Sequence, residues 1–114
     1  MVKSVMITPD CKIEEVSEEQ EREKMSKRLW DGCSLQVPEY WEHKKFRLTM
    51  TFPDIFTEHD RLNPLATYIF RNLKHPRGIP DDVLCGTVFI SNENGDELLD
   101  FTMEDLKYIM KRIT

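Results

Sequence analysis

The chain has 114 residues, enough for one domain with its own core, and its 39% hydrophobic and 32% charged residues exclude wholesale disorder. No apolar run approaches the ~20 residues of a membrane span. The net charge is −5, and eight acidic against three basic residues over positions 81–114 argue against a general nucleic-acid binder. The start of the chain also lacks a signal peptide, so we expect a cytoplasmic protein.

The first third of the chain predicts two strands joined by a turn, followed by a helix. The expected elements are a strand over 2–7, a weak return strand over 12–16 and a helix over 18–30. Residues 8–11 have the Pro and Asp of a turn. Ser17 and Gln20 have the spacing of a capping box, and Gly32 is expected to end the helix in the left-handed conformation.

The middle of the chain is organised around segment 46–52, in which every second residue is apolar. One face of this strand should therefore be buried and the other wet. A shorter strand over 33–37 precedes it, and Pro38 either ends that strand or places it at an edge of the sheet. Asn63 occupies the N-cap position of a helix over 64–75 with a broad apolar face.

The last third of the chain predicts a buried strand, a hairpin and a helix. The expected elements are a central strand over 83–90, a short return strand over 97–99 and a helix after Thr102. Gly86 indicates a bulge or a close backbone approach within the first of these. Asn94-Gly95 predicts the hairpin, and Asp105 completes a capping box with Thr102.

The expected fold class is α+β, in one globular domain over residues 1–114. The mostly short connections between strands predict a mostly antiparallel sheet of about five strands, with three helices largely on one face.

Several of these segments resemble, in order, a family of small proteins from phages, plasmids and some large DNA viruses, known as domain of unknown function 3846. A helix running into Gly32 is among them. The others are Ile7-Thr8-Pro9, Leu35-Gln36-Val37, Arg47-Leu48-Thr49-Met50, Asn63-Pro64-Leu65-Ala66-Thr67 and Gly86-Thr87-Val88-Phe89-Ile90. The resemblance implies a virus or mobile element as the source and implies no activity.

The sequence contains no catalytic signature. It has no Walker loop, no Gly-rich dinucleotide fingerprint and no Gly-x-Ser-x-Gly. The three cysteines include no Cys-x-x-Cys pair, which indicates reduced thiols. The scattered Cys33, His43, His59 and Cys85 lack the spacing of metal ligands. We therefore expect no catalytic residue, no cofactor and no metal.

The leading functional hypothesis is a non-enzymatic accessory protein that binds a protein partner. The Glu-rich helix over 18–24 and the loop over 53–62 are the surfaces favoured for binding. The candidate partner surface comprises Asp54, Ile55, Phe56, Glu58, Tyr40 and Trp41. The edge strand before Tyr40 and Trp41 leaves both a homodimer and a monomer open.

The alternative is nucleic-acid or phosphate binding through basic residues around the helix over 64–75. The candidate contacts are Arg47, Arg61, Arg71, Lys74 and Arg77. The simpler interpretation of this group is that cations near a helix C-terminus complement the helix dipole and aid solubility.

Overall fold

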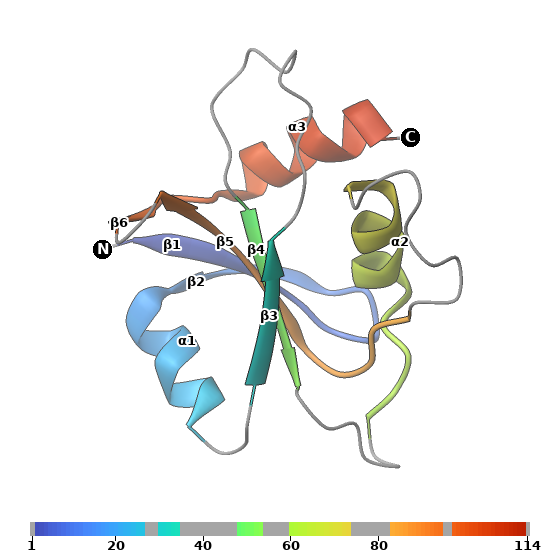
Figure 1. The fold of residues 1–114 in the computed structure, drawn as a ribbon, viewed down its shortest axis with the longest axis horizontal. Coiled ribbons are helices and arrows are strands. Elements are labelled where there is room, and N and C mark those ends of the chain that lie inside the picture. The colour runs from blue at the N-terminus through green and yellow to red at the C-terminus, as the bar shows by residue number, and fades with distance from the viewer. Residues whose placement is uncertain are drawn as a thin grey trace.

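The computed structural model describes residues 2–26, 30–34, 48–53, 60–73, 83–94 and 97–113. This part of the chain holds six strands and three helices (Figure 1). The strands are β1 (Lys3–Ile7), β2 (Ile13–Ser17), β3 (Trp30–Ser34), β4 (Leu48–Pro53), β5 (Val88–Asn94) and β6 (Glu97–Leu99). The helices are α1 (Glu18–Met25), α2 (Pro64–Leu73) and α3 (Met103–Ile113).

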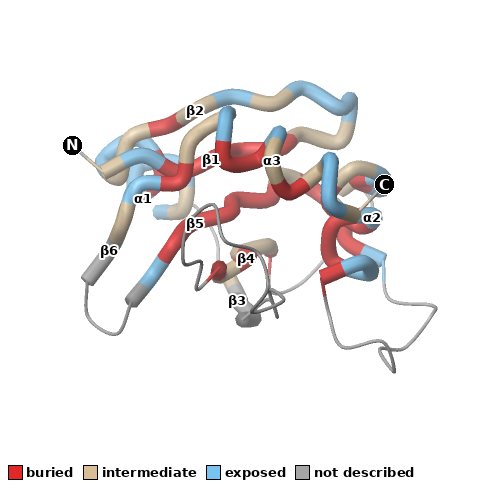
Figure 2. The backbone as a smooth tube through the Cα atoms, turned by 90° about the horizontal axis from the view of Figure 1, so that it is seen from above, coloured by how far each residue is buried: buried red, intermediate tan, exposed pale blue. Residues whose placement is uncertain are grey.

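All the strand pairs in the described residues are antiparallel and belong to one sheet, in the order β2-β1-β5-β4-β3, with β6 paired to β5. The α+β class and the antiparallel sheet predicted from the sequence are confirmed. The register places Asn94 opposite Glu97, which confirms the hairpin between β5 and β6. Figure 2 shows that the buried backbone runs along β1 and β5, in the middle of the molecule.

The two faces of the sheet carry different helices. On one face, here called the α2/α3 face, the buried strand residues pack against α2 and α3; they are Val5, Ile7, Leu48, Met50, Val88 and Ile90. The opposite face, here called the α1 face, carries Met6, Val16 and Phe89, which pack with Met25 of α1. Two of the three helices therefore share a face, and α1 packs mainly against β1 and β2 on the other.

The first helix is shorter than predicted. α1 begins with the predicted capping box, in which Ser17 Oγ accepts from the Gln20 backbone N–H (3.2 Å), but it ends at Met25. Trp30 belongs to β3, opposite Pro53, and Gly32 lies opposite Thr51, so the predicted helix end at Gly32 is wrong. Pairing with β4 overrides the helical spacing of the apolar residues. Residues 35–37 of the predicted strand lie outside the described residues.

The strand predicted over 83–90 begins five residues later than expected. Val83 is exposed, Cys85 makes an isolated bridge with Leu62, and β5 starts at Val88. Gly86 lies between them with φ +81°, a conformation that side chains with a Cβ rarely adopt. A Cβ here would lie 3.1 Å from both Asp60 Oδ1 and Pro53 Cγ. The predicted close backbone approach at Gly86 is confirmed.

The fully buried Asn63 joins three segments. Its Oδ1 accepts from the Ala66 backbone N–H (3.1 Å), which confirms it as the N-cap of α2. Its Nδ2 donates to the carbonyl oxygens of Ile7 and Gly86, both at 2.9 Å. All the polar atoms of this buried amide therefore have partners, and the start of α2 is fixed against the end of β1 and the Gly86 turn.

Candidate functional site

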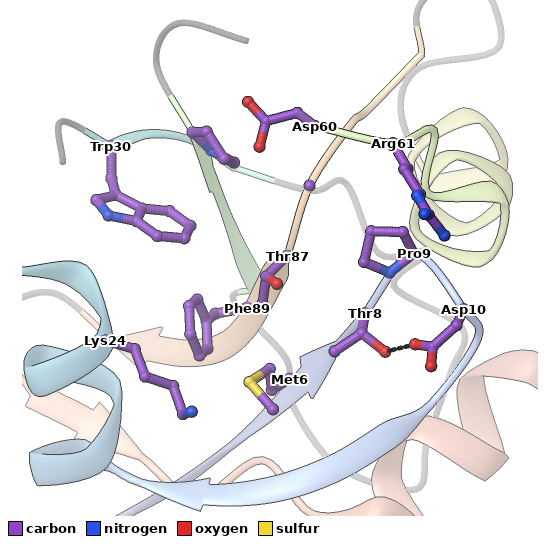
Figure 3. Close-up of a pocket in the computed structure, with 12 residues that line it drawn as sticks. Met6, Thr8, Pro9, Asp10, Lys24, Trp30, Asp60, Arg61, Thr87 and Phe89 are labelled. Atoms are coloured by element: carbon purple, nitrogen blue, oxygen red, sulfur yellow. Dashed lines mark hydrogen bonds between the residues drawn. The ribbon is translucent and has the colours of Figure 1, made fainter. Parts of the chain in front are cut away.

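A pocket of about 630 Å³ opens on the α1 face, and we call it the Trp30 pocket (Figure 3). It is lined by Met6, Thr8, Pro9, Asp10, Lys24, Trp30, Pro53, Asp60, Arg61, Gly86, Thr87 and Phe89. A pocket of this volume falls in the range of small-ligand sites, ~300–1,000 Å³. It forms where α1 leaves the β5-β4-β3 side of this face uncovered within the described residues.

The floor of the Trp30 pocket is aromatic and apolar. Phe89 is fully buried and Met6 nearly so, and the rings of Trp30 and Phe89 lie 5.5 Å apart with a tilt of 59°. This is the offset, tilted geometry that aromatic pairs prefer. In Figure 3 the six-membered ring of Trp30 points toward the middle of the pocket and its nitrogen points away. That nitrogen is buried and has no acceptor among the described residues.

Strand alternation explains why these side chains meet. Met6 and Phe89 are directly opposite in the β1-β5 register, so both point to the face opposite Val5 and Ile90. Trp30 is opposite Pro53 at the end of β3. The left-handed turn at Gly86 lies against Asp60, on the segment before α2, and Thr87 follows it in the lining.

The rim of the Trp30 pocket carries charges of both signs. Asp60 points toward the Trp30 side and Arg61 toward the side of Asp10, while Lys24 extends from α1 (Figure 3). The hydroxyl of Thr8 donates to Asp10, and this bond holds the pKa of the Asp10 carboxyl below its ordinary value, although the group is exposed. The apolar floor is therefore surrounded by two carboxylates, Asp10 and Asp60, and two cations, Lys24 and Arg61.

A further carboxyl, that of Glu21, lies on the α1 face outside the lining of the Trp30 pocket. Glu21 is buried, and its Oε2 accepts from the hydroxyl of Ser4 at 2.8 Å. Burial raises the pKa of Glu21, the bond from Ser4 opposes that rise, and the nearby charges of Glu93 and Glu18 add to it. This carboxyl contacts the sheet from α1 rather than the pocket floor, so we assign it a structural role.

The six residues of the candidate partner surface, Asp54, Ile55, Phe56, Glu58, Tyr40 and Trp41, all lie outside the described part of the chain. The other surface favoured for binding, the Glu-rich helix, is α1, on which Glu19 and Glu23 are exposed and Glu21 is buried. The residues that flank positions 54–59 are Pro53 and Asp60, and both line the Trp30 pocket. The predicted loop therefore starts and ends at this pocket.

Of the five basic residues predicted to contact phosphate or nucleic acid, two fall in the described part of the chain. Arg61 is exposed on the rim of the Trp30 pocket, and Arg71 is exposed in the last turn of α2, outside its lining. The helical rise of ~1.5 Å per residue separates Arg71 from the start of α2 by roughly 10 Å. Arg47, Lys74 and Arg77 lie outside the described residues.

The pocket floor was missed by sequence reasoning. Trp30 was assigned to a helix, and Met6 and Phe89 were assigned only to strands. One signal could have identified the floor: β1 and β5 are apolar at successive positions, so both faces of the central strands carry large apolar side chains.

In the part of the chain that the structure describes, no three His, Cys, Asp or Glu side chains are grouped so that they could hold a metal ion. Cys11 is exposed and Cys85 is partly buried. None of the three described helices has the length and apolar character needed to cross a bilayer.

Comparison with known proteins gives no relative, because no protein-family model, no curated protein and no solved structure matches this chain.

Proposed function

We propose that this chain is a non-enzymatic accessory protein that binds another protein, with the Trp30 pocket as the contact site. The observation that carries the proposal is the pocket itself, an open space of about 630 Å³ with Trp30 packed on Phe89 at its base. Large aromatic side chains in such pockets supply much of the energy of protein association. An apolar side chain of the partner would be buried against Trp30.

The charges on the rim favour a protein over a nucleic acid as the occupant. Asp10 and Asp60 would repel a phosphate backbone, whereas alternating charges suit a polypeptide with side chains of both signs. Such rim charges contribute more to orientation and association rate than to affinity.

The cellular setting of the proposal is the cytoplasm of a cell that carries a virus or mobile element. The ordered segments that resemble the family of phage, plasmid and large-virus proteins support this setting. The absence of paired cysteine spacing in the sequence agrees with a reducing compartment.

The test is quantitative affinity capture from extract of the native cell, comparing Thr87→Arg with Thr49→Arg. Thr87 lines the pocket, so an arginine there fills it, whereas Thr49 lies on the same face outside the lining. We expect Thr87→Arg to lose the captured protein and Thr49→Arg to keep it, with both variants folded. Equal capture by both, or turnover by the isolated protein against a metabolite panel, would reject the proposal.

A second candidate is nucleic-acid or phosphate binding through Arg61, which shares the pocket with Trp30, a residue on which a base can stack. Affinity for a single-stranded probe should then fall steeply as salt rises, because phosphate contacts release counterions. Arg61→Gln should weaken binding and flatten the salt response. No gel shift at low salt removes this candidate.

The homodimer considered from the sequence stays a prediction. Within the described residues β3 pairs only with β4, so it lies at an edge of the sheet. Sedimentation of the wild type beside Trp41→Ala tests it. A dimer lost only in the variant places the interface near Trp41, and monomers in both reject it.

A further inference from the structure

A second cavity lies on the α2/α3 face, where α3 passes the edge strand β2. It has a volume of about 410 Å³ and is lined by Ile13, Met103, Leu106, Lys107, Met110 and Lys111. We call it the Met-lined groove. The helix residues follow the i, i+3, i+4 spacing of one helix face, and Ile13 closes the other side from the start of β2.

The apolar side chains of the Met-lined groove are only partly covered by the fold. Ile13, Met103 and Met110 are half-buried against the core, beneath which Leu106 is almost fully buried. Methionine is unbranched and flexible, so its side chain adapts to slender apolar ligands. The surface of the groove is therefore apolar, with flexible methionine side chains that rest on the buried Leu106.

The charged side chains that line the Met-lined groove are both basic, and the carboxylate of Glu15, which accepts from the Met103 backbone N–H at 2.7 Å, lies beside its Met103 end and outside the lining. Its charged lining residues are Lys107 and Lys111, both exposed and one helical turn apart, and none of the described residues that line it is acidic. The net charge of the whole chain is −5, so the positive charge beside this groove is opposite in sign to that of the chain as a whole. An occupant that complements this groove is apolar along its length and negative at its end.

We propose that the Met-lined groove binds a medium-chain fatty acid, with the alkyl chain against Met103 and Met110 and the carboxylate at Lys107 and Lys111. The volume is in the range of small-molecule sites. Two lysines match one carboxylate, whereas anionic membrane surfaces are recognised by clusters of about four to eight basic residues. The site lies on the opposite face from the Trp30 pocket, so it stands independently of the proposed function.

Methionine methyl NMR tests the proposal, because the chain's six methionines include Met103 and Met110 in the groove and Met6 in the Trp30 pocket. Decanoate should shift the methyl signals of Met103 and Met110 saturably, with Met6 unmoved. Decyltrimethylammonium has the same chain and the opposite charge, and it should bind more weakly. Met→Leu variants assign the signals.

The matched variants are Lys107→Glu and Arg22→Glu, which change the net charge equally. Lys107→Glu should weaken decanoate binding about fivefold, because an exposed attraction becomes a repulsion, and should strengthen binding of the cationic detergent. Arg22→Glu, on the exposed side of α1 and outside the lining of both pockets, should change neither. Three results would each overturn the proposal: no saturable shift up to about 1 mM decanoate, shifts centred on Met6, or equal binding of both head groups.

Discussion

The two faces of the sheet differ in how completely helices cover them. The α2/α3 face is closed over its centre, where Val5, Ile7 and Met50 are fully buried beneath two helices and the amide of Asn63 has all its polar atoms bonded; it opens only at the Met-lined groove beside β2, within the described residues. The α1 face has one short helix, and this face carries the Trp30 pocket. The difference shows that two helices bury the strand residues at the centre of the first face more completely than one short helix buries those of the second.

The cause lies in the composition of the covering helices. α1 is rich in charge, and Met25 is its apolar contact with the sheet core, so it has too little apolar surface to cover five strands. α2 and α3 each place several apolar residues at helical spacing, and those residues are buried. A helix that cannot bury the sheet leaves strand residues such as Phe89 to be covered by Trp30.

The largest effect on stability is expected from Asn63→Asp, which removes the amide that joins α2 to the end of β1 and to the Gly86 turn. A carboxylate there would face the carbonyl oxygens of Ile7 and Gly86 and would lose both donated bonds. We expect a loss of about 3–5 kcal/mol at pH 7 in urea unfolding, typical of an uncompensated buried charge.

The pH dependence of Asn63→Asp has a definite sign. Burial disfavours the charged carboxylate, so the folded protein is more stable when this carboxyl is protonated, and stability is partly regained on acidification. The recovery is partial because the protonated carboxyl has one O–H donor in place of the two bonds that the Asn63 amide donates. Asn72→Asp is the control, because Asn72 is an exposed amide on the same helix that bonds the Tyr68 carbonyl. Equal losses in the two variants would contradict the role given to Asn63.

The next effect compares adjacent residues of β4 that point to opposite faces. Met50→Ala leaves a cavity on the closed face and should cost about 2–5 kcal/mol of unfolding free energy. Thr51→Ala, on the partly covered face, should cost about 0.5 kcal/mol or less. Equal costs by chemical denaturation would mean that the two faces contribute equally to stability.

A smaller effect is expected from Gly86→Ala, at the turn that both faces use. Its φ of +81° disfavours a Cβ, which would also press on Asp60 and Pro53, so we expect a loss of about 1–3 kcal/mol. Thr87→Ala is the control, and it should change the thermal midpoint little. An unchanged midpoint for Gly86→Ala would show that the turn relaxes without cost.

The smallest effect should be a gain, from Glu21→Gln on the α1 face. The pKa of Glu21 is raised above its ordinary value of 4.5 in the folded protein. The wild type therefore loses stability as the pH rises from 4.5 through the pKa that Glu21 has in the folded protein. Glutamine does not titrate, so the variant should unfold at a higher temperature at neutral pH, with the difference vanishing in acid. Glu19→Gln, at an exposed position of the same helix, is the control, and it should change the unfolding temperature at neutral pH little. A gain that persists in acid would assign the effect to something other than ionisation.

Much of the fold could be predicted because its signals are local. Alternation in segment 46–52 correctly placed Leu48 and Met50 inside and Thr49 and Thr51 nearer to solvent. The capping boxes at Ser17 and Thr102 and the cap at Asn63 formed as expected. Each of these depends on residues within a few positions of one another.

The errors arose where distant pairing decides. Trp30 is the last residue of the helix predicted over 18–30, yet its strand partner is Pro53, more than twenty positions away. Val83 continues the apolar run of β5, yet Gly86 turns the chain between them. The pattern of neighbouring residues carries no information about a strand partner that lies far away in the sequence.

The Trp30 pocket was beyond sequence reasoning for the same cause. Its lining comes from β1, the turn after it, α1, β3, the end of β4, the segment before α2, the Gly86 turn and β5. Periodicity gives the face of each side chain but gives no distance between elements. The predicted loop over 53–62 was nevertheless a useful pointer, because Pro53 and Asp60 lie on the rim.

The position of β1 in the sheet has a consequence for synthesis on the ribosome. β1 emerges first, yet it lies between β2 and β5, and its Lys3 carbonyl accepts from the Phe101 N–H at 2.8 Å. The nascent chain can form the β1-β2 hairpin early, but the sheet cannot close until residues 88–101 have left the exit tunnel, because those strands must pair over a long sequence separation. Stalled chains that end before residue 88 should therefore remain open to protease. Protection at that length would show that the N-terminal segment folds alone.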